Sequence, residues 1–173
     1  VLRRETAGRA TPQKAVAVLA DPVFDASDPR VLSATQNVRN ADDSPLIRSV
    51  RSLDRELLSR LPFSREEADA IAEFVPARLL LRATDFQASR TKALSGELSS
   101  YRIVHFATHG LLNSEHPELS GLVLSLVDEN GKAQDGFLRM HEIYNLRLPA
   151  EVVVLSACQT ALGKEIKGEG LVG

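Results

Sequence analysis

The chain has 173 residues, the size of one domain with a sizeable hydrophobic core. Its 21 lysines and arginines against 23 aspartates and glutamates give a formal net charge of -2, which argues against binding to nucleic acid or to an anionic membrane, since both need a basic surface. No apolar run approaches the length of a membrane span and no secretory signal opens the chain, so we expect a cytoplasmic location.

The first quarter of the chain predicts an arm, a strand and a loop. Residues 1–13 are charged and lack a pattern, which is typical of a flexible arm. The short apolar run at 14–20 predicts a strand buried on both faces, as in parallel sheets. A long polar loop over 21–43 follows, and Ser44 with Pro45 then predicts the start of a helix.

The middle of the chain alternates between expected helices and strands. Residues 64–67 have the pattern of a capping box that begins a helix, and Pro76 ends it. The apolar run at 77–83 predicts a strand, and Thr84 is a candidate cap for the next helix. A third strand is expected over 102–108.

The last part predicts a hairpin and a final core strand. Residues 122–126 and 132–138 flank an Asn-Gly turn and predict a small antiparallel hairpin. A short helix is expected around Met140, and 151–157 predicts another core strand. Strands that alternate with helices predict an α/β fold with a mainly parallel sheet, with the β-hairpin set apart from it.

Two reactive residues follow buried strands of this expected sheet, His109 after 102–108 and Cys158 after 151–157. Sites in such sheets lie beyond the carboxyl ends of the strands, and adjacent strands are only about 4.8 Å apart. An imidazole can activate a cysteine, and the backbone amides of Gly110 and Cys158 are candidates for an oxyanion hole. From residue types alone, the alternative is equally well supported: Cys158 is a packed core residue and His109 a hydrogen-bonded histidine at the end of a strand.

Two residue types occur only once. Met140 is the single methionine, so residue 1 is not an initiator, and we expect a piece of a longer or processed protein. Cys158 is the single cysteine, which excludes an internal disulfide and any zinc site built on several cysteines. It can be a buried apolar residue, a reactive thiol or half of an intermolecular bridge.

Two further patterns are weaker. His105 and His109 are four residues apart, but four residues of strand span about 13 Å, too far for two ligands of one ion. We therefore expect no metal, an internal hydrogen-bonded His105, and surface positions for His116 and His141. Residues 168–173 match G-x-G-x-x-G but do not directly follow a strand, so dinucleotide binding is disfavoured and a flexible active-site loop over 163–170 is expected instead.

Several segments stand out together along the chain: IVHFATHG (103–110), SGLVL (120–124), VVVLSACQT (152–160) and GEGL (168–171), with ADP (20–22) and DGFL (135–138). They resemble a CHAT domain, the caspase-like peptidase domain that often follows tetratricopeptide repeats in bacterial proteins and is related to separase. The resemblance covers roughly residues 14–173, and His109 precedes Cys158 by 49 residues, close to the caspase spacing of about 50.

The resemblance implies a caspase-like three-layer sandwich over 14–173, after the arm at 1–13 and ending before the family's final helix and strands. That ending leaves the cysteine-bearing strand at a sheet edge. The resemblance also implies a cysteine endopeptidase without a metal or organic cofactor. Cys158 is then the nucleophile that forms a thioester acyl-enzyme, His109 the general base and acid, and the amides of Gly110 and Cys158 the oxyanion hole.

The implied partners are a protein or peptide substrate and an upstream repeat domain of the same parent chain, which regulates activity. Neither nucleic acid nor a membrane is expected. The context Ser-Ala-Cys-Gln-Thr at 156–160 departs from the Gln-Ala-Cys-x-Gly of caspases, so their preference for aspartate is not carried over. The alternative is a catalytically silent, caspase-like interaction or scaffold module.

Overall fold

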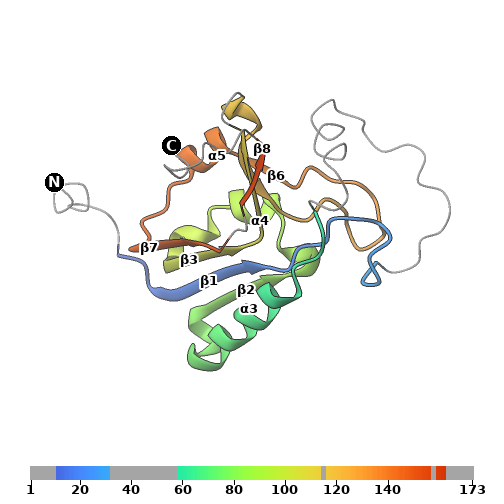
Figure 1. Cartoon of the computed structure of the whole chain (residues 1–173). Coiled ribbons are helices and arrows are strands. Elements are labelled where there is room, and N and C mark those ends of the chain that lie inside the picture. The colour runs from blue at the N-terminus through green and yellow to red at the C-terminus, as the bar shows by residue number, and fades with distance from the viewer. Residues whose placement is uncertain (1–10, 32–57, 114–115, 157–158, 163–173) are drawn as a thin grey trace, which may run out of the picture.

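The structure is a computed structural model, and it describes residues 11–31, 58–113, 116–156 and 159–162 (Figure 1). The arm predicted at 1–13 lies mostly outside these residues. The helix predicted to begin at Ser44, the nucleophile candidate Cys158 and the loop predicted over 163–170 also lie outside the described residues.

Four parallel strands form the main sheet within the described residues, in the order β2-β1-β3-β7. They are β1 (Lys14–Ala20), β2 (Leu80–Thr84), β3 (Tyr101–Ala107) and β7 (Val152–Leu155). The central strand β1 is buried on both faces, as its unbroken apolar run predicts. The predicted α/β fold with a mainly parallel sheet is therefore confirmed.

A second sheet lies beside the first, with the order β6-β5-β4-β8. It consists of β4 (His109–Asn113), β5 (Gly121–Val123), β6 (Phe137–Arg139) and β8 (Gln159–Leu162). The pair β5–β6 is antiparallel, which confirms a hairpin set apart from the main sheet. Its strands are shorter than predicted. The pairing of β5 with β4, and of β4 with β8, was not predicted at all.

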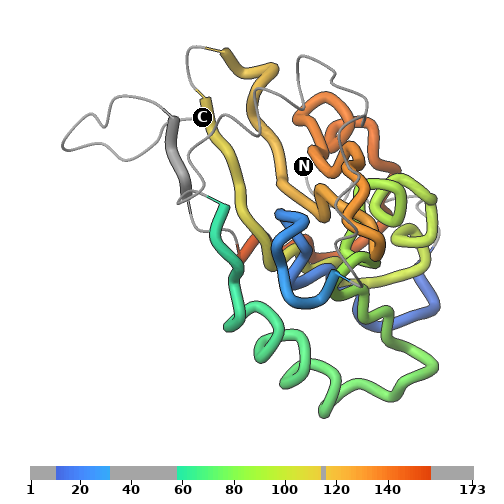
Figure 2. Tube along the Cα trace, turned by 90° about the vertical axis from the view of Figure 1, so that its right-hand side faces the viewer, coloured from blue at the N-terminus to red at the C-terminus, as the bar shows by residue number. Residues whose placement is uncertain are grey.

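Thr108 alone separates β3 from β4, so the chain passes from one sheet into the other at this residue. The Thr108 side chain is fully buried, and its hydroxyl donates a hydrogen bond to the carbonyl of Val123 in β5. Figure 2 shows the yellow segment running from the main sheet into the second sheet without a break. His109 is the first residue after this junction.

Helices cover the two faces of the main sheet. Helix α3 (Pro62–Phe74) packs on one face, where Ala68 meets Val16 and Val18 of β1. Helix α4 (Arg90–Leu94) and the residues around α5 (Met140–Asn145) pack on the opposite side. Figure 1 shows the sheet between these helices, which makes three layers. No helix among the described residues is long and apolar enough to cross a membrane.

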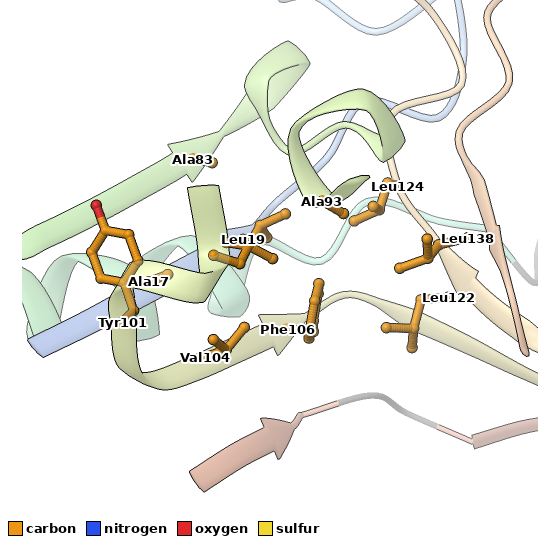
Figure 3. Close-up of a cluster of buried hydrophobic side chains, with 11 residues drawn as sticks. Ala17, Leu19, Ala83, Ala93, Tyr101, Val104, Phe106, Leu122, Leu124 and Leu138 are labelled. Carbon is orange, nitrogen blue, oxygen red and sulfur yellow. The ribbon is translucent and has the colours of Figure 1, made fainter. Parts of the chain in front are cut away.

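The largest core cluster joins the two sheets. Figure 3 shows side chains of the main sheet, including Leu19 and Phe106, in one cluster with Leu122, Leu124 and Leu138 of the second sheet region. All five are at least 95% buried. Because apolar burial is the main favourable term in folding, this shared core fixes the position of the second sheet against the first.

Three predicted boundaries were wrong for local reasons. Helix α3 begins at Pro62 rather than after Ser64, because proline is favoured in the first helical turn, and Ser64 does not cap it. A 3-10 turn precedes β2, which starts at Leu80. Ser89, not Thr84, caps α4, since the Ser89 hydroxyl accepts a hydrogen bond from the Lys92 amide at 3.2 Å.

Strand β7 is the last strand at one side of the main sheet in the described part of the chain. Its side chains are more exposed than a core strand predicts. Val152, Val153 and Leu155 have exposed fractions of 48%, 47% and 58%. An edge strand has a neighbour on one side only, and few described residues lie over its two faces.

Candidate functional site

The two strands that precede His109 and Cys158 are neighbours in the main sheet, which is the condition for the two side chains to meet. Phe106 in β3 pairs with Leu155 in β7, and each lies three residues before one of the candidates. Beyond the candidates, Gly110 in β4 pairs with Gln159 in β8. The strands before and after Cys158 therefore pair in the same parallel register with the strands before and around His109. Cys158 itself lies outside the described residues.

The imidazole of His109 is buried, with a residue exposure of 4%. Its Nε2 lies 2.7 Å from the carbonyl oxygen of Ser59, and its ring packs against the ring of Phe24 at a centroid distance of 5.1 Å. The other ring nitrogen, Nδ1, is buried and has no hydrogen-bond partner within the described part of the chain.

These contacts determine the tautomer of the neutral ring. A carbonyl oxygen can only accept a hydrogen bond, so Nε2 of His109 must carry the hydrogen that Ser59 receives. Nδ1 then holds the lone pair and is the nitrogen that can accept a proton. A neutral histidine with one nitrogen anchored and the other open is the arrangement that a general base requires.

Ser59 and Phe24 were not predicted as site residues. Ser59 acts through its backbone carbonyl, which every residue type has, so no sequence pattern marks it. Phe24 does carry a signal, because it is the single aromatic residue in the polar stretch 21–43. An aromatic side chain in such a loop directly after a buried strand is a candidate for packing at the strand's carboxyl end.

A cluster of ion pairs surrounds Asp21, the first residue after β1. The Asp21 carboxylate is fully buried and lies within 3.0 Å of guanidinium nitrogens of Arg30, Arg60 and Arg65. Arg30 and Arg65 also bind Asp85, which follows β2. Burial opposes the charge of Asp85, but the hydrogen bonds from Arg65 and Arg30 outweigh it and lower its pKa. The cluster joins the ends of two strands to the segment that leads into α3.

His105 belongs to a separate cluster on the α3 side of the sheet. Its Nε2 lies 3.0 Å from Oγ of Ser156 and 3.4 Å from Oε1 of Glu67, and the Ser156 hydroxyl donates to Glu67 at 3.2 Å. His105 is 4% exposed, so the predicted internal, hydrogen-bonded histidine is confirmed. The cluster ties α3 to β3 and to the residue that follows β7.

The remaining predicted site residues are placed as follows. His116 and His141 are exposed, as expected. Gly110 lies inside β4, where it pairs with Leu122 on one side and with Gln159 on the other, and its part in an oxyanion hole stays a prediction. Among the described residues, no group of three or more His, Cys, Asp or Glu side chains is arranged to hold a metal ion.

Comparison with known proteins finds one family. A family model described as "CHAT domain" matches residues 1–173. No curated protein and no solved structure matches the chain.

Proposed function

The chain belongs to the CHAT domain family, a member of the caspase-like protease clan, and from this membership we propose that it is a cysteine endopeptidase domain. In this proposal Cys158 is the nucleophile and His109 the general base and acid. The observation that carries it is the His109 ring, which is anchored at Nε2 and has no hydrogen-bond partner at Nδ1 among the described residues. The ring lies two residues after β3, the strand that pairs with β7.

The proposed reaction has two halves. The Cys158 thiol gives its proton to Nδ1 of His109, and the sulfur attacks the carbonyl carbon of the scissile peptide bond. The imidazolium then returns that proton to the leaving amine as the carbon–nitrogen bond breaks, which leaves a thioester. Water attacks the thioester while His109 takes a proton from it, and the acid product departs as the proton returns to the sulfur.

The Ser59 carbonyl has a defined part in this cycle. When Nδ1 takes up the proton, both ring nitrogens become donors, and the positive charge is shared with Nε2–H. The bond from Nε2–H to the Ser59 carbonyl then becomes charge-assisted and stronger. We propose that this bond both orients the ring and stabilises its protonated state.

The proposed partners rest on membership of the family and not on contacts seen in the structure. We propose that the substrate is a protein or peptide and that an upstream repeat domain of the same parent chain regulates cleavage. The proposal places the protein in the cytoplasm. It needs no metal or organic cofactor, because the nucleophile, base and backbone donors are all supplied by the chain.

A peptide probe with a thiol-reactive group tests the proposal in this chain and in its intact parent. We expect covalent labelling of the wild type, none of Cys158→Ala, and strongly reduced labelling of His109→Gln. His116→Gln is a matched control, since it removes an exposed imidazole whose ring nitrogen lies 3.2 Å from the Glu118 carboxylate. Labelling that ignores Cys158→Ala, or no labelling of the parent under any activating condition, would favour the silent interaction module instead.

A further inference from the structure

We propose that Asp21 and Arg60 are positioning residues that hold the Ser59 carbonyl against His109 and so select Nδ1 as the proton acceptor. The catalytic consequence rests on the proposed function, whereas the effect on the histidine tautomer does not. Ser59 and Arg60 lie in the segment that enters α3, and Figure 2 shows this teal segment beside the strand that continues into β4.

The first attachment is a two-pronged ion pair. Arg60 directly follows Ser59, and its Nε and Nη2 donate to Oδ1 and Oδ2 of Asp21 at 3.0 and 2.8 Å. Such bidentate pairs fix both distance and orientation. Since the Asp21 side chain is fully buried, the anchor cannot swing toward solvent without opening the core. The main chain beside Arg60 is therefore held at the end of β1.

The second attachment comes from the backbone of the same aspartate. The Asp21 amide donates to Oγ of Ser64 at 2.9 Å, and the Ser64 hydroxyl donates to the Leu61 carbonyl at 2.7 Å. One residue thus ties the segment at Arg60 and again at Ser64. A segment held at two points near Ser59 presents the Ser59 carbonyl in one direction, which is what the bond to Nε2 of His109 requires.

The conformation of Asp21 fits a functional role. Its φ of 47° lies in the left-handed region, which residues other than glycine rarely adopt. Such strained positions persist where the surrounding contacts determine them, and they gather at functional sites. Three residues later, Phe24 packs against the His109 ring. The loop after β1 therefore acts on His109 twice, through Phe24 directly and through Arg60 and Ser59.

Arg60→Met is the variant of choice, because the Arg60 side chain is 41% exposed and its loss leaves Asp21 with two other arginines. Arg65→Met is the matched control. Arg65 also binds Oδ2 of Asp21, at 2.7 Å, but it is not adjacent to Ser59. Arg60→Lys keeps the charge and loses the two-pronged geometry.

The measurement is the pair of ring ¹⁵N shifts of His109 in the full 173-residue chain, at a pH where the ring is neutral. We expect the wild type and Arg65→Met to show one tautomer, with hydrogen on Nε2. Arg60→Met should shift toward a mixture of tautomers, and Arg60→Lys should lie between them. In the peptide-probe assay, Arg60→Met should label about fivefold more slowly than Arg65→Met, the effect of one hydrogen bond.

Two results overturn the inference: an unchanged His109 tautomer in Arg60→Met, or an equal change in Arg65→Met, which would make the cluster merely structural. Failure of the proposed function looks different. In that case the tautomer changes only in the Arg60 variants, and the peptide probe labels neither the variants nor the parent. This result would support the positioning role and contradict the proposed peptidase activity.

Discussion

His105 and His109 lie four residues apart and are equally buried, yet their surroundings give them different chemistry. His105 bonds to the side chains of Ser156 and Glu67, which join it to two other elements. His109 bonds to a backbone carbonyl through one nitrogen and keeps the other open within the described residues. The first arrangement stabilises the fold, and the second leaves a lone pair for proton transfer.

This contrast predicts opposite effects of substitution. His105→Ala removes a buried side chain and its hydrogen bonds, so we expect the free energy of unfolding to fall by about 2 kcal/mol. Peptide-probe labelling of the folded protein should persist, whereas His109→Gln should nearly abolish it. Urea unfolding and labelling rates measured on the same samples separate the two effects. Loss of labelling in folded His105→Ala would show that His105 also takes part in the chemistry.

Residue patterns in the sequence mark some residues of the candidate site and leave others unmarked. His109 and Cys158 stand out because each follows an apolar run that predicts a strand, and the strand order shows that these two strands are neighbours. Ser59 acts through a backbone atom and cannot be recognised from its side chain. Asp21 is visible in the sequence only as the residue after β1, since its three arginine partners come from distant positions.

At the scale of elements, β4 shows what local patterns miss. Residues 109–113 lack the alternation of a surface strand, so the predicted strand ended at Thr108. In the structure, β4 is held by pairing with β5, which follows it after a short connection, and with β8, which lies far along the chain. The start of α3 was missed for a local reason, because the proline signal at Pro62 prevails over the capping pattern at Ser64.

The exposed strand β7 leads to an element-scale prediction. An edge strand with exposed apolar side chains is a template for pairing with another chain, and lysine on such an edge opposes it. Val153→Lys should therefore slow self-association of the 173-residue chain, because Val153 is 47% exposed and its substitution leaves the buried core intact. Static light scattering over time measures this. The exposed Val152→Ile, which keeps the edge apolar, is the control and should associate like the wild type.

The whole molecule is held together by ion pairs between its elements as well as by the shared core. Two guanidinium nitrogens of Arg90 in α4, Nε and Nη2, donate hydrogen bonds to the two carboxylate oxygens of Glu142 in α5. Burial opposes the charge of Glu142, but the hydrogen bonds from Arg90 and from the Arg139 amide outweigh it and lower the pKa of Glu142 to about 2. The ion pair thus connects two helices on the same side of the main sheet.

This shift predicts acid sensitivity with a defined sign. The pKa of Glu142 falls from its ordinary value of 4.5 to about 2 in the folded protein. The stability that its ionised carboxylate contributes is therefore complete above pH 4.5 and is lost as the pH falls toward 2. Wild type should be more stable than Glu142→Gln by about 2 kcal/mol at pH 7, and this difference should vanish near pH 2. Urea unfolding at several pH values measures it. A difference that stays constant with pH would contradict the assigned ion pair.

The overall architecture was the most predictable part. Short buried runs between helices identify a parallel α/β sheet, and an Asn-Gly turn identifies the hairpin. The register between strands and the passage from one sheet into the other depend on packing across the whole chain. That packing includes the core between Phe106 and Leu122, which local sequence patterns do not predict.

The most direct measurement of the central proposal is the rate of Cys158 alkylation by iodoacetamide as a function of pH. Cys158 is the single cysteine, so the modified protein reports on that thiol alone. A thiol paired with His109 should keep reacting well below the pKa of about 8.5 of a free cysteine. His109→Gln should move the profile back to that value, and His116→Gln should not. Identical profiles for wild type and His109→Gln would contradict the pairing of Cys158 with His109.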